Sequence, residues 1–444
     1  MKVEKLGTFT ITMMNVAAIA SLRNLPIAAS YGHFSLVCYA FAAFFFFLPI
    51  SFSCMYLSSR IDGGIYRWVS AAMGKRMGLV AVWLQWFENA VWYPTILSFA
   101  ITNFLLPLFP SLAHSPTVLL FSIVALFWVC SLLHLLGARA MGWMTSLAVL
   151  CGTVIPFITL LSLSWVQLPW MSSLTEPHTM SDYASSYSLS MGDWSTWTAM
   201  AGVSLSFAGM ELSDAHYNHV RDPKRTIPRS IIYSTFLILC IYVVGTLALL
   251  SILPPEQIQV LSGLTEAVGV ALTKAGWSIH WQPLFALLLS IGALATVFTW
   301  TIGPTQGLFL AAKEGILPAR LAQTTKKEVP STLLLFQGVC VTLFTVAYSM
   351  SGSLEEGFWW LVIIASQSCL AMYVLLFIAA LLLQASRWEQ MVAWVGLITT
   401  IAIFVLGCIP PPRIGHTYAW PLIVVGSIVL SCFIPLMVCK ERRS

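Results

Sequence analysis

The sequence predicts an all-α protein that crosses a membrane many times and is built from two halves of five spans each. Composition is the first observation: the 444 residues are 58% hydrophobic and only 9% charged, with a mean hydropathy of +0.85. Repeated apolar runs are the second, because each approaches the length that crosses a bilayer. The third is a pair of interruptions, at Ser21–Pro26 and at Phe207–Glu211, far enough apart to leave room for five spans per half.

Hydropathy predicts twelve spans along the chain. The first begins near residue 9 and has no small-residue cleavage site behind a short core, so we expect it to be a retained span and not a signal peptide. We place the spans at 9–30, 35–57, 78–106, 116–136, 142–166, 194–215, 229–253, 281–311, 331–350, 357–384, 391–409 and 417–438.

Positive charge predicts how these spans are oriented. Of the 22 Lys and Arg residues, all except Arg23, Lys274 and Arg413 fall on the side of the N-terminus under this span assignment. Short basic loops mark the cytoplasmic side, so we expect a multi-pass protein of the inner or plasma membrane with both termini in the cytoplasm. The basic loops would face anionic lipid headgroups, and no basic domain indicates nucleic acid.

Cysteine and histidine patterns predict neither a metal site nor a cofactor. The ten cysteines are scattered singly and none form a CxxC pair, so no zinc site or disulfide framework is indicated. The sequence also has no phosphate-binding P-loop and no HExxH motif. We therefore expect no cofactor and no enzyme activity.

The two interruptions predict a binding site. Each combines a helix breaker, Pro26 or Gly209, with an ionisable side chain, Arg23 or Glu211. A broken helix leaves backbone N–H and C=O groups unpaired, which hydrocarbon tolerates only where they line a cavity or hold a ligand. Paired broken helices in two halves indicate a transporter's substrate site. Half-helix N-termini would hold a carboxylate, and unwound carbonyls would accept from an ammonium group.

Arg23 has two possible roles. A charged side chain near mid-membrane is costly and normally faces a pathway or a partner. It could hold a substrate carboxylate as a fork-shaped donor, or it could form an internal ion pair, most plausibly with Glu88. We favour the pair slightly, and with it a zwitterionic or weakly acidic substrate.

Span three carries a polar and aromatic segment, with Glu88, Trp92 and Tyr93 just before Pro94. Aromatic walls with few polar groups are typical of small-molecule pockets, whereas Trp and Tyr also anchor spans at membrane interfaces. Next to a carboxylate we favour the pocket. The candidate substrate-binding residues are Ala20, Ser21, Leu22, Arg23, Asn24, Glu88, Trp92, Tyr93, Phe207, Ala208 and Gly209.

Glu211 follows the second interruption directly and is our candidate for gating or proton coupling. A carboxylate in low dielectric favours its neutral form, which suits a proton carrier or a gate. His216 lies further along and could relay a proton, although a histidine at a helix end is more often structural.

The segment 254–280 is expected to hold a short amphipathic helix on the outer side. Ile258, Leu261, Leu264, Val268 and Leu272 recur at helical spacing. This helix could lie over the outer mouth of the pathway, or it could pack on the span ends as an ordinary loop helix.

Several stretches resemble one transporter superfamily. The chain is similar to amino acid–polyamine–organocation transporters, in particular the branch of bacterial glutamate/γ-aminobutyrate antiporters. The matching stretches are Ser21–Pro26, Gly63–Val69, Phe207–Glu211 continuing through His216 to Pro223, Arg225 and Pro228, Gly303–Pro304, Gly315–Pro318 and Val329–Pro330.

This resemblance implies a leucine-transporter-type 5+5 inverted repeat with broken first and sixth helices plus two further C-terminal spans. The repeats would be 1–190 and 191–385, and 386–444 would hold the last two spans and a short tail. It implies alternating access to a midplane site, with Glu211 as the gating acid. The family's glycine-rich first break is absent here, and the short tail, Lys440–Ser444, is not expected to act as a plug.

We therefore expect a secondary active transporter for zwitterionic or acidic amino acids, working by exchange or by proton symport. A polyamine or organic-cation transporter is a first alternative, which Arg23 disfavours. A membrane-embedded enzyme is the alternative from another class, and a transporter-derived sensor is the third. Expected partners are the amino acid, a proton or counter-substrate, and membrane lipids.

Overall fold

The structure is a computed structural model that describes residues 6–113, 115–171, 194–214, 220–351, 354–383, 386–409 and 420–439. Within these residues the regular secondary structure is helical, apart from one isolated bridge between Leu6 and Val220. Nine of the described helical segments are long and apolar enough to cross a membrane. The predicted all-α, multi-pass class is therefore confirmed, whereas the number of twelve spans stays a prediction.

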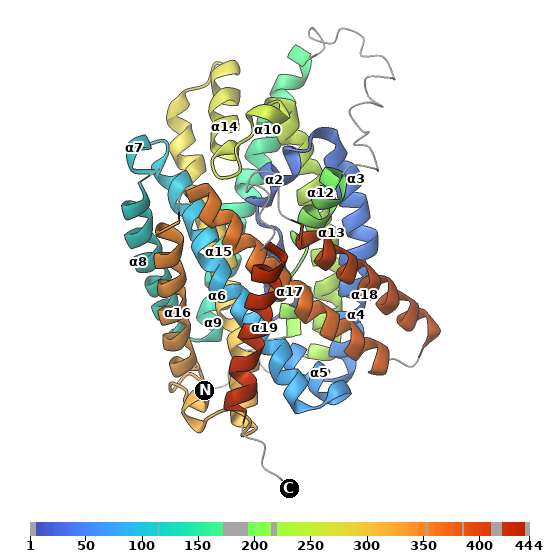
Figure 1. Cartoon of the computed structure of the whole chain (residues 1–444). Helices are drawn as coiled ribbons and strands as arrows, with labels where there is room; N and C mark the ends of the chain where they lie inside the picture. The colour runs from blue at the N-terminus through green and yellow to red at the C-terminus, as the bar shows by residue number, and fades with distance from the viewer. Residues whose placement is uncertain are drawn as a thin grey trace.

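Figure 1 shows the order of the helices along the chain. Up to residue 171 they are α1 (Thr8–Ile19), α2 (Asn24–Ala29), α3 (Ser35–Ala42), α4 (Leu48–Arg60), α5 (Gly64–Met73), α6 (Lys75–Leu105), α7 (Pro110–Ala113), α8 (Pro116–His134), α9 (Ala138–Val149) and α10 (Ile155–Met171). Beyond residue 193 they are α12 (Trp194–Leu205), α13 (Pro223–Ile252), α14 (Gly263–Lys274), α15 (Gln282–Lys313), α16 (Ser331–Ser349), α17 (Leu354–Leu383), α18 (Arg387–Gly407) and α19 (Trp420–Val438).

Two π-helical turns keep long helices continuous. Ala43–Phe47 joins α3 to α4, and Leu150–Val154 joins α9 to α10. In the second turn Gly152 lies against Gly292 of α15 so closely that a Cβ on Gly152 would come within 2.0 Å of the Gly292 nitrogen. The two glycines let these helices approach backbone to backbone.

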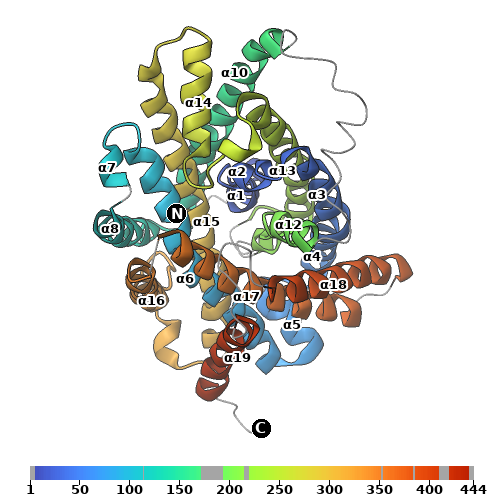
Figure 2. The ribbon, with the colours of Figure 1, turned by 45° about the horizontal axis from the view of Figure 1, so that its top comes forward.

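Both predicted interruptions are present in the structure. The first lies between α1, which ends at Ile19, and α2, which begins at Asn24. The second separates the end of α12 at Leu205 from a short 3-10 turn, η4 (Met210–Asp214). Figure 2 shows α1, α2 and α12 next to one another in the middle of the molecule, surrounded by α3, α13, α15 and α17. The broken helices are thus the centre of the fold.

The long helix α6 forms much of the wall around this centre, because it packs against α5, α15 and α17. Its polar and aromatic segment remains helical through Pro94. The chain enters α1 and leaves α19 at the end of the molecule that carries α5, and α14 lies at the opposite end (Figure 1). These are called the α5 end and the α14 end below.

The expected amphipathic helix is α14. Leu264, Val268 and Leu272 are buried on one face, and α14 packs on α10, α13 and α15. The helix therefore covers span ends. The segment just before it, including Pro255, Ile258 and Val260, lines the mouth of the central cavity described next.

Candidate functional site

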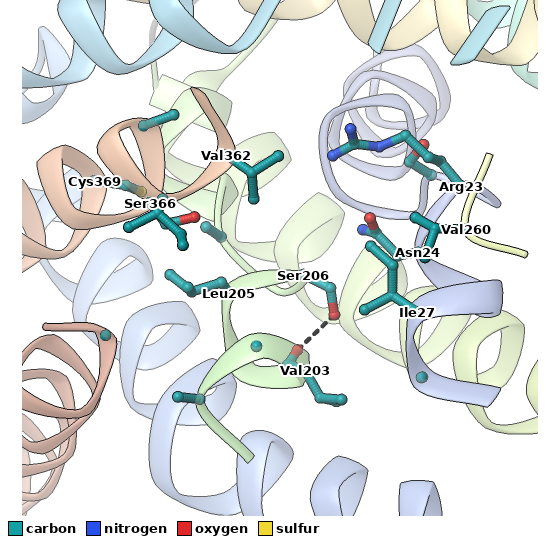
Figure 3. Close-up of a pocket in the computed structure, with 18 of the residues that line it drawn as sticks. Arg23, Asn24, Ile27, Val203, Leu205, Ser206, Val260, Val362, Ser366 and Cys369 are labelled. Atoms are coloured by element: carbon teal, nitrogen blue, oxygen red, sulfur yellow. Dashed lines mark hydrogen bonds between the residues drawn. The ribbon is translucent and has the colours of Figure 1, made fainter. Parts of the chain in front are cut away.

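A cavity of about 560 Å³ lies between the two helix breaks. Its walls come from the two breaks, α6, α15, α17 and α18, and it extends to the segment before α14. Figure 3 shows Arg23 and Asn24 of the first break across the cavity from Ser366 and Cys369 of α17, with Leu205 and Ser206 of the second break between them. The volume suits a small organic molecule.

Six of the predicted binding residues line this cavity, and they come from three separate segments. The first break contributes three of them, α6 two and the second break one. They are Ser21, Arg23, Asn24, Glu88, Trp92 and Ala208.

The other predicted residues do not line it. Ala20, Leu22, Tyr93, Phe207 and Gly209 are buried behind the wall or within the breaks, and Glu211 is also outside the lining. His216 lies outside the described residues, so its relay role stays a prediction.

Tyr93 and Phe207 are turned away from the cavity for identifiable reasons. Consecutive residues on a helix point about 100° apart, so Tyr93 points away from the cavity that its neighbour Trp92 faces. The Tyr93 hydroxyl instead accepts a hydrogen bond from Gln337 Nε2 of α16 at 3.2 Å. Phe207 packs edge-on against Tyr39 and Tyr242. Both rings support the site from behind.

The first break leaves carbonyl oxygens that other helices satisfy. Trp300 of α15 donates a hydrogen bond from its indole N–H to the Ala18 carbonyl at 2.9 Å. The Tyr242 hydroxyl of α13 donates one to the Ile19 carbonyl. The backbone N–H groups of Leu22 and Arg23, by contrast, have no hydrogen-bond partner within the described part of the chain. The break thus offers two free donors next to the Arg23 side chain.

The second break is tied down by two tyrosines. The Tyr242 hydroxyl lies within hydrogen-bond distance of the Ser206 carbonyl, at 2.9 Å. The same hydroxyl therefore contacts the backbone of both breaks. The N–H of Gly209 donates to the Tyr373 hydroxyl at 2.7 Å. Gly209 has a φ of 124°, and a Cβ there would lie 2.8 Å from the Trp300 ring. Only glycine fits this conformation and this contact without strain.

Arg23 is buried, with only 6% of its surface exposed. Its Nη1 donates to the Thr95 hydroxyl at 3.1 Å, and its guanidinium lies 5.4 Å from the Trp92 ring centroid and 5.8 Å from that of Phe358. Its Nε has no hydrogen-bond partner in the described residues. The guanidinium is therefore held by neutral groups and keeps donors free.

The expected ion pair between Arg23 and Glu88 is absent from the described residues, which corrects the preference stated above. Arg23 reaches α6 at Trp92 and Thr95, one to two turns beyond Glu88. Glu88 instead contacts the Cys369 side chain, and its Oε2 is buried without a hydrogen-bond partner. The site thus holds an arginine and a glutamate that do not pair with each other.

Glu211 lies behind the second break, not on the cavity surface. It is 2% exposed. Gln85 Nε2 donates to its Oε1 at 3.0 Å and the Tyr373 hydroxyl donates to its Oε2 at 2.5 Å. The carboxylate joins α6, η4 and α17 into one network just beneath the cavity.

A family model described as amino acid permease matches residues 6–432 of the chain. The chain belongs to this amino acid permease family. The permease is 31% identical to an uncharacterized transporter of Legionella pneumophila, with 98% of this chain and 97% of the relative covered. It is 23% identical to a glutamate/gamma-aminobutyrate antiporter of Lactococcus lactis subsp. lactis, with coverage of 98% and 90%. A second such antiporter, from subsp. cremoris, is 24% identical over 79% of this chain and 70% of its own.

These relatives indicate a transporter for amino acids and not an enzyme. The residues that the structure describes contain no group of three or more His, Cys, Asp or Glu side chains that could hold a metal ion. The cavity lining of the permease is mostly apolar, with Arg23, Glu88 and Glu256 as its basic and acidic side chains, a composition typical of small-molecule pockets.

Sequence reasoning missed several cavity residues of the permease. Trp300 and Thr296 come from α15, Ser366 and Cys369 from α17, and Ile403 and Leu406 from α18. These helices have no break and no charged residue near the site. A hydropathy profile therefore does not distinguish the residues that line the cavity from the other apolar residues of the same helices. The closeness of the Trp300 ring to Gly209 is visible only in the structure.

Proposed function

We propose that the permease is a secondary active transporter that moves zwitterionic or acidic amino acids across the inner or plasma membrane by alternating access. The observation that carries the proposal is the cavity between two broken helices, with the Arg23 side chain in its wall. In the first break beside it, the N–H groups of Leu22 and Arg23 have no hydrogen-bond partner among the described residues. A guanidinium with free donors suits a carboxylate, because it binds two oxygens in parallel.

The proposal includes the arrangement of the chain in the membrane. Residues 1–190 and 191–385 would form inverted repeats of five spans each, with 386–444 as an addition and both termini in the cytoplasm. The paired breaks, which occupy corresponding places in the two segments, support this arrangement. Glu211 would couple the cycle to protons or act as a gate, with His216 as a further candidate.

Exchange is the mode that the two Lactococcus relatives are named for, and proton symport is the competing mode. An uptake assay in proteoliposomes distinguishes them. We expect uptake of a radiolabelled zwitterionic or acidic amino acid that rises when an amino acid is preloaded inside. Uptake driven by an inward proton gradient into empty vesicles would indicate symport instead.

The same assay tests the substrate class. Its panel should include the twenty amino acids, γ-aminobutyrate and common polyamines. Uptake of polyamines alone would support the organic-cation alternative and contradict a carboxylate role for Arg23. Absence of any substrate-dependent uptake by correctly folded protein, verified by its elution profile and thermal unfolding, would contradict the proposed function.

A further inference from the structure

Two acidic side chains lie next to each other at one wall of the cavity. Glu88 of α6 lines the cavity, and Glu211 of η4 is buried just behind the lining. On α17, Cys369 contacts Glu88, and Tyr373 donates a hydrogen bond to Glu211 at 2.5 Å. Because Cys369 and Tyr373 are four residues apart on one helix, the two acids are offset by about one helical turn. Figure 3 shows Cys369 at the cavity wall across from Arg23.

Helix α6 places the two acids in the same relation. Gln85 Nε2 donates to Glu211 Oε1 at 3.0 Å, and Glu88 follows Gln85 by three residues on the same face of the helix. The two carboxyl groups are close enough to interact electrostatically. The protonation of one therefore affects the protonation of the other.

The contacts of the two carboxyl groups differ. Both oxygens of Glu211 accept hydrogen bonds, from Gln85 and Tyr373, and such bonds favour the ionised form. Glu88 is half-buried because it faces the cavity, and its Oε2 is buried without a hydrogen-bond partner among the described residues. No Lys or Arg of the described residues lies within ion-pair distance of Glu88. A carboxyl group that lacks these contacts favours the neutral acid.

Few other charged or titratable groups surround Glu88. Helix α15 and the other helices that pack on α6 bring no Asp, Glu, Lys, Arg or His to the cavity lining within the described residues. Arg23 reaches α6 one to two turns beyond Glu88. The groups that remain are Cys369 and Tyr373 on α17, Glu211 in η4, Tyr93 on α6 itself and Arg23 in the first break.

We propose that Glu88 and Glu211 together hold one exchangeable proton, which enters and leaves through Glu88 from the cavity. With the proton bound, Glu88 is a neutral acid and Glu211 is a carboxylate. Release breaks the Glu88 O–H bond and transfers the proton to solvent that enters the cavity. It leaves two neighbouring carboxylates that repel each other, so the pair binds one proton readily and is less stable without it.

This inference rests on the proposed transport function, and it adds to that function the place where a proton binds. Glu211 is sealed behind the lining, so a proton from the cavity reaches the pair at Glu88. Glu256 also lines the cavity but is exposed at its mouth, where a carboxyl group is ionised at neutral pH. Glu256 is therefore an internal comparison for the labelling experiment below.

The first experiment labels neutral carboxyl groups with N,N′-dicyclohexylcarbodiimide, an apolar reagent that adds to a protonated carboxylic acid. The full-length protein in liposomes is treated at a series of pH values and digested, and mass spectrometry locates the adducts. We expect an adduct on Glu88 at mildly acidic and neutral pH, its loss at alkaline pH, and none on Glu256 at neutral pH. In Glu211→Gln the loss should move to lower pH, because the neighbouring negative charge is removed.

Infrared difference spectra between acidic and alkaline pH measure the same proton without a reagent that must enter the cavity. The C=O band of a carboxylic acid should disappear in Glu88→Gln. It should remain in Glu266→Gln, whose side chain on α14 lies outside the cavity lining. If Glu88→Gln does not fold, the labelling of the wild-type protein still tests the proposal.

The pH dependence of uptake in proteoliposomes tests whether the two acids share a single proton. Glu88→Gln and Glu211→Gln should each flatten the profile, and the double variant should match either single variant. Two independent proton sites would instead give additive changes, and additive changes would overturn the shared proton.

The other contrary outcomes are equally definite. An adduct on Glu211 in place of Glu88, an adduct on Glu88 that persists at alkaline pH, or a carboxylic acid band retained in Glu88→Gln overturns the inference. So does a wild-type pH profile in Glu88→Gln. Labelling and infrared spectra do not require transport. A protein that transports no amino acid contradicts the proposed function, whereas failure of both spectroscopic and labelling tests in a transporting protein contradicts only this inference.

Discussion

Tyr373 of α17 donates a hydrogen bond to Glu211 at 2.5 Å and accepts one from the Gly209 N–H at 2.7 Å. One hydroxyl thus links the second helix break to the carboxylate that follows it. The bond fixes the break against α17, the same helix that lines the cavity through Ser366 and Cys369. Any movement of α17 that opens the cavity would alter the surroundings of Glu211.

Tyr373→Phe should destabilise the protein by about 1–3 kcal/mol, because it leaves the Gly209 N–H and one Glu211 oxygen without a partner in a buried site. The measurement is the midpoint of thermal unfolding in detergent. Tyr348→Phe is a matched control, since among the described residues the one hydrogen-bond partner of that hydroxyl is the Ser98 hydroxyl, at 3.2 Å. Equal shifts for the two variants would argue against a special role of Tyr373.

Glu211→Gln should flatten the pH dependence of transport while the protein stays folded. The amide retains an oxygen that accepts from Tyr373 but cannot release or take up a proton. The measurement is the exchange rate in proteoliposomes from mildly acidic to neutral pH. Glu266→Gln on α14, outside the cavity lining, should keep the wild-type profile. A profile unchanged by Glu211→Gln would remove the coupling role.

Arg23 and Glu88 should show little coupling in stability, since they do not form an ion pair. The double-mutant cycle of Arg23→Ala and Glu88→Ala is expected to give an interaction below about 0.5 kcal/mol, as for side chains without a shared contact. Arg23→Lys should still weaken substrate binding about tenfold, because an ammonium replaces a planar fork. A large coupling energy would restore the ion pair that the sequence suggested.

The sequence was sufficient to predict the class of the fold and the position of both breaks. Pro26 and Gly209 interrupt apolar runs next to ionisable side chains, and this conflict with a continuous helix is local. Local signals of this kind do not depend on the packing of distant segments. The α1–α2 break and the α12–η4 break therefore lie where the sequence placed them.

The partners of the site residues could not be predicted, because they depend on how helices sit against one another. From the sequence, Trp92 and Tyr93 are equally good candidates for facing a cavity, because apolar residues occur on all sides of this helix. Only the packing of the helices shows that Trp92 faces the cavity. Arg23 contacts α6 at Thr95, beyond Glu88, because of where the first break lies along the axis of α6. No sequence pattern indicates the position of the first break along the axis of α6.

Gly209→Ala should strongly impair folding or transport. The residue has a φ of 124°, and an added Cβ would meet the Trp300 ring at 2.8 Å. Strain in this backbone region costs about 1–3 kcal/mol before any clash is counted. Gly426→Ala in α19 is the control, since a Cβ there meets nothing within 4 Å. Wild-type unfolding and uptake in Gly209→Ala would show that the break tolerates other conformations.

Glu314, at the end of α15, joins three groups at the α5 end. Arg67 lies 3.0 Å from its Oε1 and Lys75 3.5 Å from its Oε2, and the Tyr66 hydroxyl donates to Oε2 at 3.0 Å. Burial and the neighbouring carboxylate raise the pKa of Tyr66, so this hydroxyl remains a donor at physiological pH. The cluster fastens α5 to α15 in this conformation.

Glu314→Gln should therefore increase local opening of the α5 end while it lowers the free energy of global unfolding only slightly. Arg67 and Lys75 are 42% and 64% exposed, so each ion pair contributes only about 0–1 kcal/mol. We expect faster amide hydrogen exchange in Gly64–Met73 with a small change in the unfolding midpoint. Asp222→Asn is the control, because its ion pair with Arg225 joins residues of one turn. If exchange in Gly64–Met73 stays at the wild-type rate in Glu314→Gln, α5 is held by its apolar packing, because Ile65, Trp68 and Val69 are buried on the same short helix.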